Sequence, residues 1–558
     1  DVTYMWIWNV PVTKELVDRE LLEYKKAGIN SLYIVPLPKD FRPESIRTFL
    51  EPEYMTEEFL DIVEYTVRKS IELGMKPWLY DEGGWPSGGA CGITFRQNPG
   101  AKLKFLEKRK ITLRGDKRFY PEDGFVALFR GKKRLPDNYI AAGDVELDAY
   151  YITERINDLN RVDYTDESVI DTFINNTYEK YKERLGDLFG DSLPIIFTDE
   201  PGLMRDSIAT DEFALFEKRF GYDLRNFLYV IEDSGKLCET EEEIQARIDH
   251  GILLGELFKK NTFEKLSNWC ENAGIYFSGH LDIDNRPHGG MVKCTFSMID
   301  ALRSFHVPAV DLIWEQIRYP YGGRVPLDDE TLGFGFFPRL ASSAARQCGR
   351  NVSATESLGI FGDGLTHDEI RYVTNYQIMR GINAVNYGSI TLGKSRASCL
   401  LTRPNFRPEK PGFYNMKEFN EYFARLCYLA RLGYVVGDTA IYMPCRDYWA
   451  GPDAVDDANI SFKELGTALE EKNIPFDIID DAGILMAEDT GDGLKLGDAI
   501  YRHIAVPDCK YMPYDVKEKI APYLGQGKSE YNFKNKNLRS MTRKLSKDVL
   551  FFVFNEGE

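Results

Sequence analysis

The chain is poor in histidine and has no paired cysteine motif, and both shortages narrow its chemistry. Six His and nine Cys occur among 558 residues, and no two Cys form a C-x-x-C pair. An odd, scattered set of cysteines indicates reduced and mostly buried thiols rather than a disulfide scaffold. The chain also has no G-x-x-x-x-G-K-[ST], H-E-x-x-H or G-x-S-x-G motif. These absences argue against a P-loop NTPase, a zinc peptidase and a serine hydrolase.

Basic residues and long apolar runs are also scarce. The chain has 70 Lys and Arg against 88 Asp and Glu, a formal net charge of −18. Phosphate binding needs an excess of cations, so nucleic acid and anionic membranes are not expected partners, whereas a neutral substrate is compatible. No run of eighteen apolar residues is present, so no transmembrane span is predicted. The chain opens at Asp1 rather than Met, which is consistent with removal of an upstream signal.

The remaining sequence has the alternation of an α/β protein. A chain of 558 residues is too long for one core, so two or more domains are expected. Eight apolar strands, each followed by a helix or a helical insertion, are predicted at 4–9, 31–37, 76–80, 194–197, 275–278, 309–312, 352–355 and 384–387. This pattern predicts a (β/α)8 TIM barrel. A doubly wound open sheet would alternate similarly, but no G-x-G-x-x-G follows the first strand.

Three domains are predicted from changes in this pattern. Residues 1–433 form the barrel, with an inserted β subdomain near 100–165 where apolar and polar residues alternate. Residues 434–527 form a smaller α/β domain. Residues 528–558 are a fragment of a further β domain, which ends on the apolar run 549–554 with no partner strand evident in the sequence. An unpaired edge of this kind favours aggregation, so we expect residues to be missing after about 527 or beyond 558.

Two glutamates are the candidate catalytic residues. Glu200 follows the fourth strand and Glu356 follows the seventh, so both would lie at the mouth of the barrel. Two carboxyl groups on different strands are the minimum needed to cleave a glycosidic bond. Glu200 is predicted to be the general acid, with Asp199 as a like charge that raises its pKa. Glu356 is predicted to be the nucleophile or the base towards water. A helix-capping or structural role is the alternative for each.

Further polar and aromatic residues at strand ends are candidates for binding a sugar. Trp8 and Trp85 could stack on a pyranose ring, or could pack in the core and in a tight turn. His280, Asp282 and Asp284 are either a hydrogen-bonding set for hydroxyls or a Ca²⁺ site. The complete set predicted to bind substrate is Trp8, Asn9, Tyr80, Asp81, Glu82, Trp85, Asp199, His280, Asp282, Trp314, Glu315, Asn386 and Tyr387, and Asp311 is expected beside it.

Several motifs resemble those of known glycoside hydrolases. Phe197-Thr198-Asp199-Glu200-Pro201 and Thr355-Glu356 resemble the acid/base and nucleophile motifs of the large retaining barrel clan, in which Asn usually stands where Asp199 is. Trp6-Ile7-Trp8-Asn9, residues 80–88, Ser278-Gly279-His280 and Arg380-Gly381-Ile382-Asn383 resemble α-L-rhamnosidase-like barrel enzymes, whose chemistry is inverting and calcium-assisted. Residues 434–527 resemble the amidotransferase-like domain of some β-galactosidases, but have no Cys nucleophile in a Gly-rich turn.

These features predict an exo-acting glycoside hydrolase that uses Glu200 and Glu356. The first choice of substrate is an α-L-rhamnoside or a related glycan terminus. The alternatives are a β-galactosidase-like retaining enzyme and a non-catalytic carbohydrate-binding protein on the same scaffold. No cofactor is required, with Ca²⁺ as an alternative, and a homo-oligomer is considered. The resemblance implies a bacterial enzyme, either cytoplasmic or exported.

Overall fold

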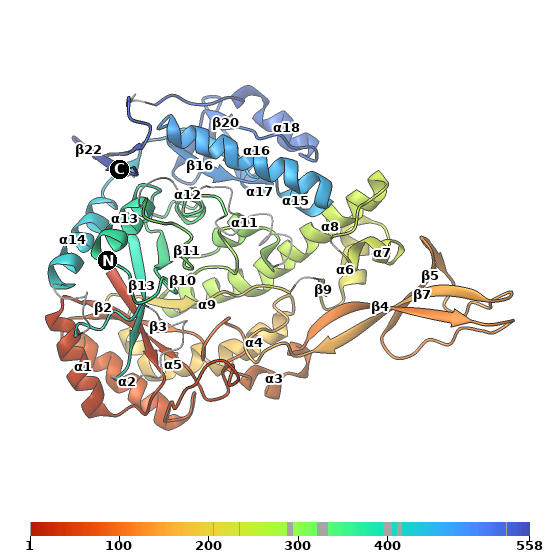
Figure 1. Ribbon diagram of the computed structural model, residues 1–558, viewed down its shortest axis with the longest axis horizontal. Helices are drawn as coiled ribbons and strands as arrows, with labels where there is room; N and C mark the ends of the chain where they lie inside the picture. Colours follow the sequence, from red (N-terminus) through yellow and green to blue (C-terminus); the bar gives the residue numbers. More distant parts are fainter. Residues whose placement is uncertain are drawn as a thin grey trace.

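The computed structural model describes residues 2–204, 206–233, 235–286, 294–320, 333–393, 404–409, 416–529, 531 and 533–557. At its centre is a closed parallel barrel of eight strands, in the order β1-β13-β12-β11-β10-β8-β3-β2 (Figure 1). The strands are β1 Val2–Trp8, β2 Ser31–Pro36, β3 Lys76–Tyr80, β8 Ile195–Thr198, β10 Tyr276–Gly279, β11 Val307–Leu312, β12 Ala354–Ser357 and β13 Ala384–Thr391. The predicted TIM barrel is confirmed.

The helices that surround the barrel follow from local sequence signals. Thr13 caps the first helix by accepting a hydrogen bond from the Leu16 amide, and Thr366 forms a full capping box with Glu369. The helical segment that precedes β8 is divided into two helices at Thr177. The helices around the barrel include α1 Lys14–Lys26, α2 Glu57–Glu72, α4 Glu167–Asn176, α5 Tyr178–Leu185, α9 Lys265–Ala273, α11 Met298–Leu302, α12 Arg339–Gln347, α13 His367–Ile378 and α14 Met416–Leu429.

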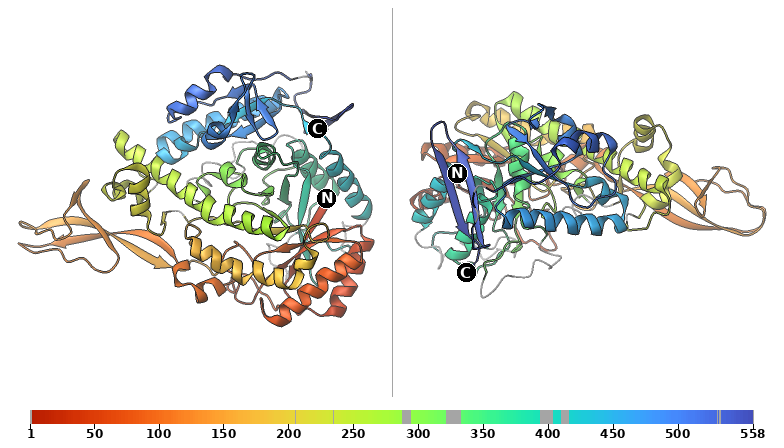
Figure 2. Two further views of the ribbon diagram at one scale, coloured as in Figure 1. Left: turned by 180° about the vertical axis from the view of Figure 1, so that it is seen from behind. Right: turned by 90° about the horizontal axis from the view of Figure 1, so that it is seen from above.

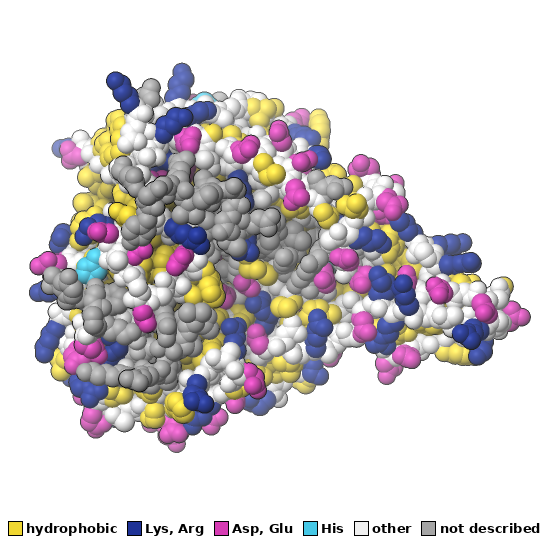
Figure 3. Space-filling view, viewed as in Figure 1, with side chains coloured by type: hydrophobic (Ala, Val, Ile, Leu, Met, Phe, Trp, Pro, Cys, Tyr) yellow, Lys and Arg dark blue, Asp and Glu magenta, His cyan; other side chains and the backbone are white. Residues whose placement is uncertain are grey.

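An antiparallel arm projects from the barrel (Figures 1 and 2). Its strands are β4 Leu103–Leu113, β5 Phe125–Arg130, β6 Lys133–Leu135 and β7 Val145–Arg155, and the short β9 Ser207–Ile208 completes the sheet. Acidic and basic side chains are intermixed on the face of the arm seen in Figure 3. Because β9 follows β8 in the chain and pairs with β4, the arm is tied to the loop that carries Glu200. Helices α6 Glu212–Phe220, α7 Leu228–Ile231 and α8 Glu241–Phe258 follow β9.

A smaller α/β unit follows the barrel. Strands β15 Thr439–Tyr442, β16 Phe476–Ile479 and β20 His503–Ala505 form a parallel sheet. The unit also contains the small sheet β17 Glu488–Asp489, β18 Leu494–Leu496 and β19 Ala499–Tyr501, together with helices α15 Cys445–Ala450, α16 Pro452–Glu471, α17 Asp481–Met486 and α18 Tyr514–Ile520. None of the described helices is both long and apolar enough to cross a membrane.

The apolar C-terminal strand has a partner, contrary to the sequence expectation. Strand β22 Val549–Asn555 pairs along its length with β21 Leu538–Lys544, and β14 Tyr434–Val435 extends this sheet on the other side of β21. The buried residues of β21 alternate along the strand and include two arginines, Arg539 and Arg543, beside the apolar Met541.

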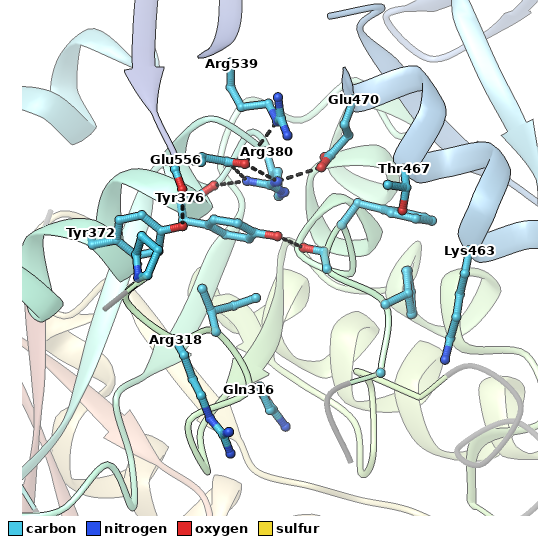
Figure 4. Close-up of a pocket in the computed structure, with 16 residues that line it drawn as sticks. Gln316, Arg318, Tyr372, Tyr376, Arg380, Lys463, Thr467, Glu470, Arg539 and Glu556 are labelled. Atoms are coloured by element: carbon cyan, nitrogen blue, oxygen red, sulfur yellow. Dashed lines mark hydrogen bonds and ion pairs between the residues drawn. The ribbon is translucent and has the colours of Figure 1, made fainter. Parts of the chain in front are cut away.

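A group of ion pairs links this hairpin to the barrel. We name it the junction cluster, and its residues are Arg339, Arg380, Glu470, Arg539 and Glu556. Arg380 lies between Glu470, at 2.6 Å, and Glu556, at 2.7 Å (Figure 4). Arg339 also pairs with Glu470 at 3.2 Å, and Arg539 pairs with Glu556 at 3.0 Å. Both carboxylates therefore contact two guanidinium groups, and the cluster joins α12, the turn after α13, α16, β21 and the residue that follows β22.

Candidate active site

Glu200 and Glu356 open onto one cavity at the C-terminal end of the barrel. Glu200 lies two residues beyond β8, and Glu356 lies within β12. Both line a cavity of about 200 Å³, together with Asp199, Trp85, Trp314 and Arg42. The backbone at Glu200 is left-handed, with φ of 47°, and the chain then turns away through Pro201. Carboxyl groups on two different strands thus face a common space, as a barrel active site requires.

Strand alternation explains which neighbouring side chains point inward. Glu356 is in register with Asp311 on one side and with Asn386 on the other. The next residue on β13, Tyr387, points outward, where its hydroxyl bonds to Thr374 of α13 at 2.7 Å. Neither side-chain polar atom of the buried Asn386 has a hydrogen-bond partner among the described residues. Asn386 thus faces the barrel interior beside Glu356 but is not among the residues that line the cavity, whereas Tyr387 belongs to the layer between strands and helices.

His280 connects two of the acidic residues. Its Nε2 lies 3.3 Å from Asp199 Oδ1 and 3.2 Å from Glu356 Oε2. Burial alone would lower the pKa of His280, but the hydrogen bonds to Asp199 and Glu356 and the nearby charge of Asp311 raise it well above its ordinary value. The imidazole is therefore held as a cation between two carboxylates. We name Asp199, Glu200, His280, Asp311 and Glu356 the mouth cluster.

The two glutamates are in different electrostatic environments. Burial, followed by the charges of Asp282 and Asp199, raises the pKa of Glu200 well above its ordinary value. No side chain of the described residues donates a hydrogen bond to Glu200. Burial and Asp199 also raise the pKa of Glu356, but the hydrogen bond from His280 opposes this rise. Glu200 is thus favoured as the protonated acid, and Glu356 as the carboxylate.

Aromatic side chains lie beneath the mouth cluster, and one of them was missed by the sequence analysis. Tyr80, a predicted binding residue, donates to Asp199 Oδ2 at 2.6 Å and lies beneath the cavity lining. Tyr33 stacks on Phe197 with ring centroids 5.3 Å apart, and its buried hydroxyl has no partner among the described residues. The alternation of side chains along the second strand is the sequence signal that could have identified Tyr33 as a residue that points into the barrel.

The glycine-rich loop after β3 uses its acidic residues internally. Glu82 is fully buried and accepts hydrogen bonds from the backbone amides of Gly83, Gly88, Ala90 and Cys91 at 2.7 to 2.9 Å. Asp81 is also buried and accepts from Ser87 at 2.6 Å and from Tyr178 at 2.7 Å. This placement argues against the predicted contact of Asp81 and Glu82 with sugar hydroxyls. Their observed contacts instead fix the loop that presents Trp85.

The predicted aromatic platforms lie in different places. Trp85 lines the cavity, and Arg42, which the sequence analysis missed, donates to its carbonyl at 3.0 Å. Trp314 also lines the cavity and is 54% exposed, so it offers a free indole face. Glu315 is exposed and pairs with Arg318 at 3.5 Å. Trp85 and Trp314 are therefore the two described tryptophans available to a ligand.

Two predicted residues after the first strand lie away from the cavity. Trp8 is fully buried and packs against Trp6 and against Phe59 of α2. Its side chain therefore points away from the barrel interior, which contradicts its predicted role as a platform for a sugar ring. Asn9 is buried as well, and its carbonyl accepts from the Phe49 amide at 2.9 Å. The β1 residues that do line the cavity are Met5 and Ile7.

The predicted His280, Asp282 and Asp284 set does not come together. Asp282 pairs with Arg161 at 2.9 Å, and Asp284 accepts from the Asp311 amide at 2.6 Å. Among the described residues, the ligand-type atoms that lie within 4.8 Å of one another belong instead to Asp199, His280 and Glu356. An imidazole beside only two carboxylates is a poor match to Ca²⁺, which prefers six to eight oxygen ligands.

Comparisons with known proteins place the fold. No family profile and no curated protein matches the chain. A rhamnosidase from Novosphingobium sp. PP1Y superposes with a TM-score of 0.67 at 14% identity, over 93% of this chain and 67% of that one. A β-galactosidase from the Antarctic haloarchaeon Halorubrum lacusprofundi gives 0.58 at 12% identity, over 94% and 71%. A GH42 β-galactosidase from G. stearothermophilus gives 0.55 at 12% identity, over 93% and 70%. The chain therefore has the TIM-barrel architecture seen in these glycoside hydrolases.

Proposed function

We propose that the protein is an exo-acting glycoside hydrolase in which Glu200 is the general acid and Glu356 is the nucleophile or the base. The observation that carries this proposal is the shared cavity: two carboxyl groups from different strands face it, and only one of them is hydrogen-bonded to a cation. Pairs of carboxyl groups whose environments separate their pKa values are typical of an acid and its partner.

The proposed reaction begins with a terminal sugar between Trp85 and Trp314. Glu200 donates its proton to the glycosidic oxygen as the bond to the anomeric carbon breaks. Glu356 either attacks that carbon or removes a proton from the attacking water, and the hydrogen bond from His280 keeps Glu356 in its charged form. The first route retains the anomeric configuration and the second inverts it.

An α-L-rhamnoside or a related glycan terminus is the first choice of substrate. The rhamnosidase-like motifs and the likeness to the Novosphingobium rhamnosidase favour it. A β-galactosidase-like retaining reaction is the second candidate, because the residues after β8 and β12 resemble those of the retaining clan. A panel of aryl glycosides identifies the sugar, and NMR of the first-formed product identifies its anomer. In the reaction as proposed, no step is assigned to calcium, and turnover unchanged by a chelator is the expected result.

The test of the acid is Glu200→Gln, assayed on aryl glycosides with good and poor leaving groups. We expect turnover to fall about 10²- to 10⁴-fold on the poor leaving group and much less on the good one. Glu464→Gln, which changes an exposed glutamate of α16 that does not line the cavity, is the control and should retain its activity. Equal losses on both substrates would remove Glu200 from the role of acid.

The competing interpretation is a carbohydrate-binding protein on the same barrel. Such a protein would hold a sugar without releasing a product, and Glu200→Gln would change its affinity rather than a rate. Measuring binding and product release on the same glycoside panel separates the two interpretations. Binding without turnover on every sugar that binds would reject the proposed hydrolase.

A further inference from the structure

A second cavity lies at the opposite end of the barrel from the mouth. It has a volume of about 230 Å³ and is lined by residues that precede β12 and β13 and by residues of α12, β14, β16 and β21. Segments that precede parallel strands lie at the N-terminal end of the barrel. The charged residues of the lining are Arg339, Arg346, Arg350, Arg380, Arg543, Asp477 and Asp498. Cations therefore outnumber anions around this cavity, in a protein whose net charge is −18.

Three of the five arginines have carboxylate partners. Arg339 and Arg380 belong to the junction cluster and share Glu470. Arg346 pairs with Asp477 at 2.7 Å. In the described part of the chain, neither Arg350 nor Arg543 lies within ion-pair distance of a carboxylate. The positive charge of these two side chains is therefore not balanced by a direct partner.

Arg543 is the more informative of the two, because it is only 2% exposed. Its Nε donates to the Leu432 carbonyl at 2.7 Å, and its Nη2 donates to the Gly433 carbonyl and to Asn351 Oδ1, both at 2.9 Å. All three acceptors are neutral. No described residue accepts a hydrogen bond from its Nη1. Burial, and then the charge of Arg346, lower the pKa of Arg543 to about 10.

This arrangement is unfavourable in the absence of an anion. A buried charge without a counter-charge destabilises the folded state, and a second guanidinium beside it adds repulsion. Capping of the chain after α14 explains the bonds from Nε and Nη2 to the carbonyls of Leu432 and Gly433. It does not explain why Nη1 has no acceptor among the described residues, or why Arg350, which donates to the Arg303 carbonyl at 3.2 Å, has no acidic partner at the same cavity. An oxyanion between the arginines would satisfy these donors and remove the repulsion.

A wider cavity of about 710 Å³ adjoins this one and shares Arg346, Tyr434, Val435, Gly437, Pro475 and Ser540 with it. Its lining adds Arg502, Lys528 and Lys544, and Asp438 is its one acidic residue among those described. The shared residues make the wider cavity an approach to the narrower one. Its excess of positive charge would attract an anion towards Arg346.

We propose that the narrower cavity binds a small tetrahedral oxyanion, held by Arg346, Arg350 and Arg543. The chemical class is phosphate or sulfate, free or as the ester group of a sugar phosphate whose remainder lies in the wider cavity. One water occupies about 30 Å³ of liquid, so the cavity has room for such a group. The site is distinct from the barrel mouth and does not depend on the proposed hydrolase reaction.

Thermal unfolding of the whole protein tests this proposal. Inorganic phosphate, sodium sulfate and a hexose 1-phosphate are titrated separately against sodium chloride at matched ionic strength. We expect a saturable rise in Tm of several degrees with the oxyanions and none with chloride, because a ligand that binds only the folded state stabilises it. A larger rise with the hexose 1-phosphate than with phosphate identifies an ester as the preferred ligand. Equal responses to chloride and to all the oxyanions would overturn the proposal.

Variants locate the site. Arg543→Met should abolish the saturable rise, and Arg350→Met, which removes a less buried side chain, should weaken the apparent affinity at least tenfold. Arg502→Met is the control: Arg502 lies in the wider cavity and pairs with Asp492, and its loss should leave the response intact. If Arg543→Met does not fold, phosphate binding to the wild type and to Arg350→Met is measured by ³¹P NMR. The proposal then predicts an affinity at least tenfold weaker in Arg350→Met. Wild-type affinity in Arg350→Met, with the response lost in Arg502→Met, would place the anion elsewhere.

Discussion

Two groups of charged side chains are buried in this protein, and they differ in how completely they are paired. In the junction cluster, each of the two glutamates contacts two arginines, and Arg380 lies between both acids (Figure 4). In the mouth cluster, His280 is the sole cation beside four carboxyl groups. One Asp311 oxygen and both polar side-chain atoms of Asn386, the two residues in register with Glu356, have no partner among the described residues.

The difference separates a structural role from a functional one. Buried charges that only support a fold are paired, because an unpaired one is costly. Carboxyl groups left unpaired at the end of a barrel are maintained at a cost to stability, which is typical of sites that act on a ligand. Burial alone therefore does not mark the candidate active site; the imbalance of charge does. Arg543, at the other end of the barrel, likewise has no counter-charge among the described residues.

The largest effect is expected from Glu356→Gln in the mouth cluster. The amide cannot act as a nucleophile or base, so turnover should fall by about 10³-fold or more while the melting temperature changes little. Turnover and Tm of the wild type and the variant are measured with the same preparation. If the variant retained wild-type turnover, Glu356 would have a structural role, and the proposed difference in role between the mouth cluster and the junction cluster would be wrong.

Glu470→Gln in the junction cluster should have the opposite signature. It leaves Arg339 without its carboxylate and Arg380 with one acid instead of two, so the free energy of unfolding should fall by about 3–5 kcal/mol. Turnover per folded molecule should not change. Urea unfolding measures the first quantity and an assay corrected for the folded fraction measures the second. Glu464→Gln, an exposed position on the same helix, should shift stability by no more than about 0.5 kcal/mol.

Much of the barrel was predictable because it depends on local patterns. Apolar runs, caps such as Thr13 and the strand-end positions of Glu200 and Glu356 are readable from neighbouring residues. Alternation along β1 and β13 also indicates that Trp8 and Tyr387 face the helices, on the opposite side of their strands from Ile7 and Asn386.

The rest depends on contacts between residues that are far apart in the chain. His280 meets Glu356 across 76 positions, and Asp282 meets Arg161 across 121. The pairing of Arg380 with Glu556 spans 176 positions. No local pattern indicates which partner such a group finds. The prediction that Glu82 binds substrate was wrong for a related reason. The backbone amides of the glycine-rich loop point inward and donate hydrogen bonds to the Glu82 carboxylate, which leaves it unavailable to a ligand.

The pH dependence of stability should separate the two clusters. Burial, supported by the charges of nearby acids, raises the pKa values of Glu200 and Asp311 well above their ordinary values, so the folded protein retains these protons when the unfolded chain has lost them. The stability associated with these groups is complete below about pH 4 and is lost as pH rises through their folded pKa values. Burial would raise the pKa of Glu470, but Arg380, Arg339 and Arg539 hold it below its ordinary value. Its contribution is present above about pH 4.5 and is lost as pH falls.

Urea unfolding of the variants between pH 3.5 and 8.5 checks this assignment. In Glu200→Gln, the free energy of unfolding should decrease less steeply as pH rises than it does in the wild type. In Glu470→Gln, it should decrease less steeply as pH falls. Glu464→Gln should leave both limbs unchanged. If the two variants flattened the same limb, the clusters would not differ in the way that their ion pairs indicate.

The smallest expected effect is a gain in stability from Glu200→Gln at pH 7.5. The carboxyl group of Glu200 is buried among other acids and accepts no hydrogen bond from a described residue, so its ionisation opposes folding. An amide of the same shape carries no charge, and we expect the free energy of unfolding to rise by about 0.5–2 kcal/mol. Glu315→Gln, at an exposed position near the same cavity, should stay within about 0.5 kcal/mol of the wild type. A stabilised variant that has lost its acid function would mean that the same carboxyl group limits stability and is needed for turnover. A destabilised variant would mean that the Glu200 carboxylate has a favourable partner in the folded protein. The charges of the mouth cluster would then be paired, as those of the junction cluster are.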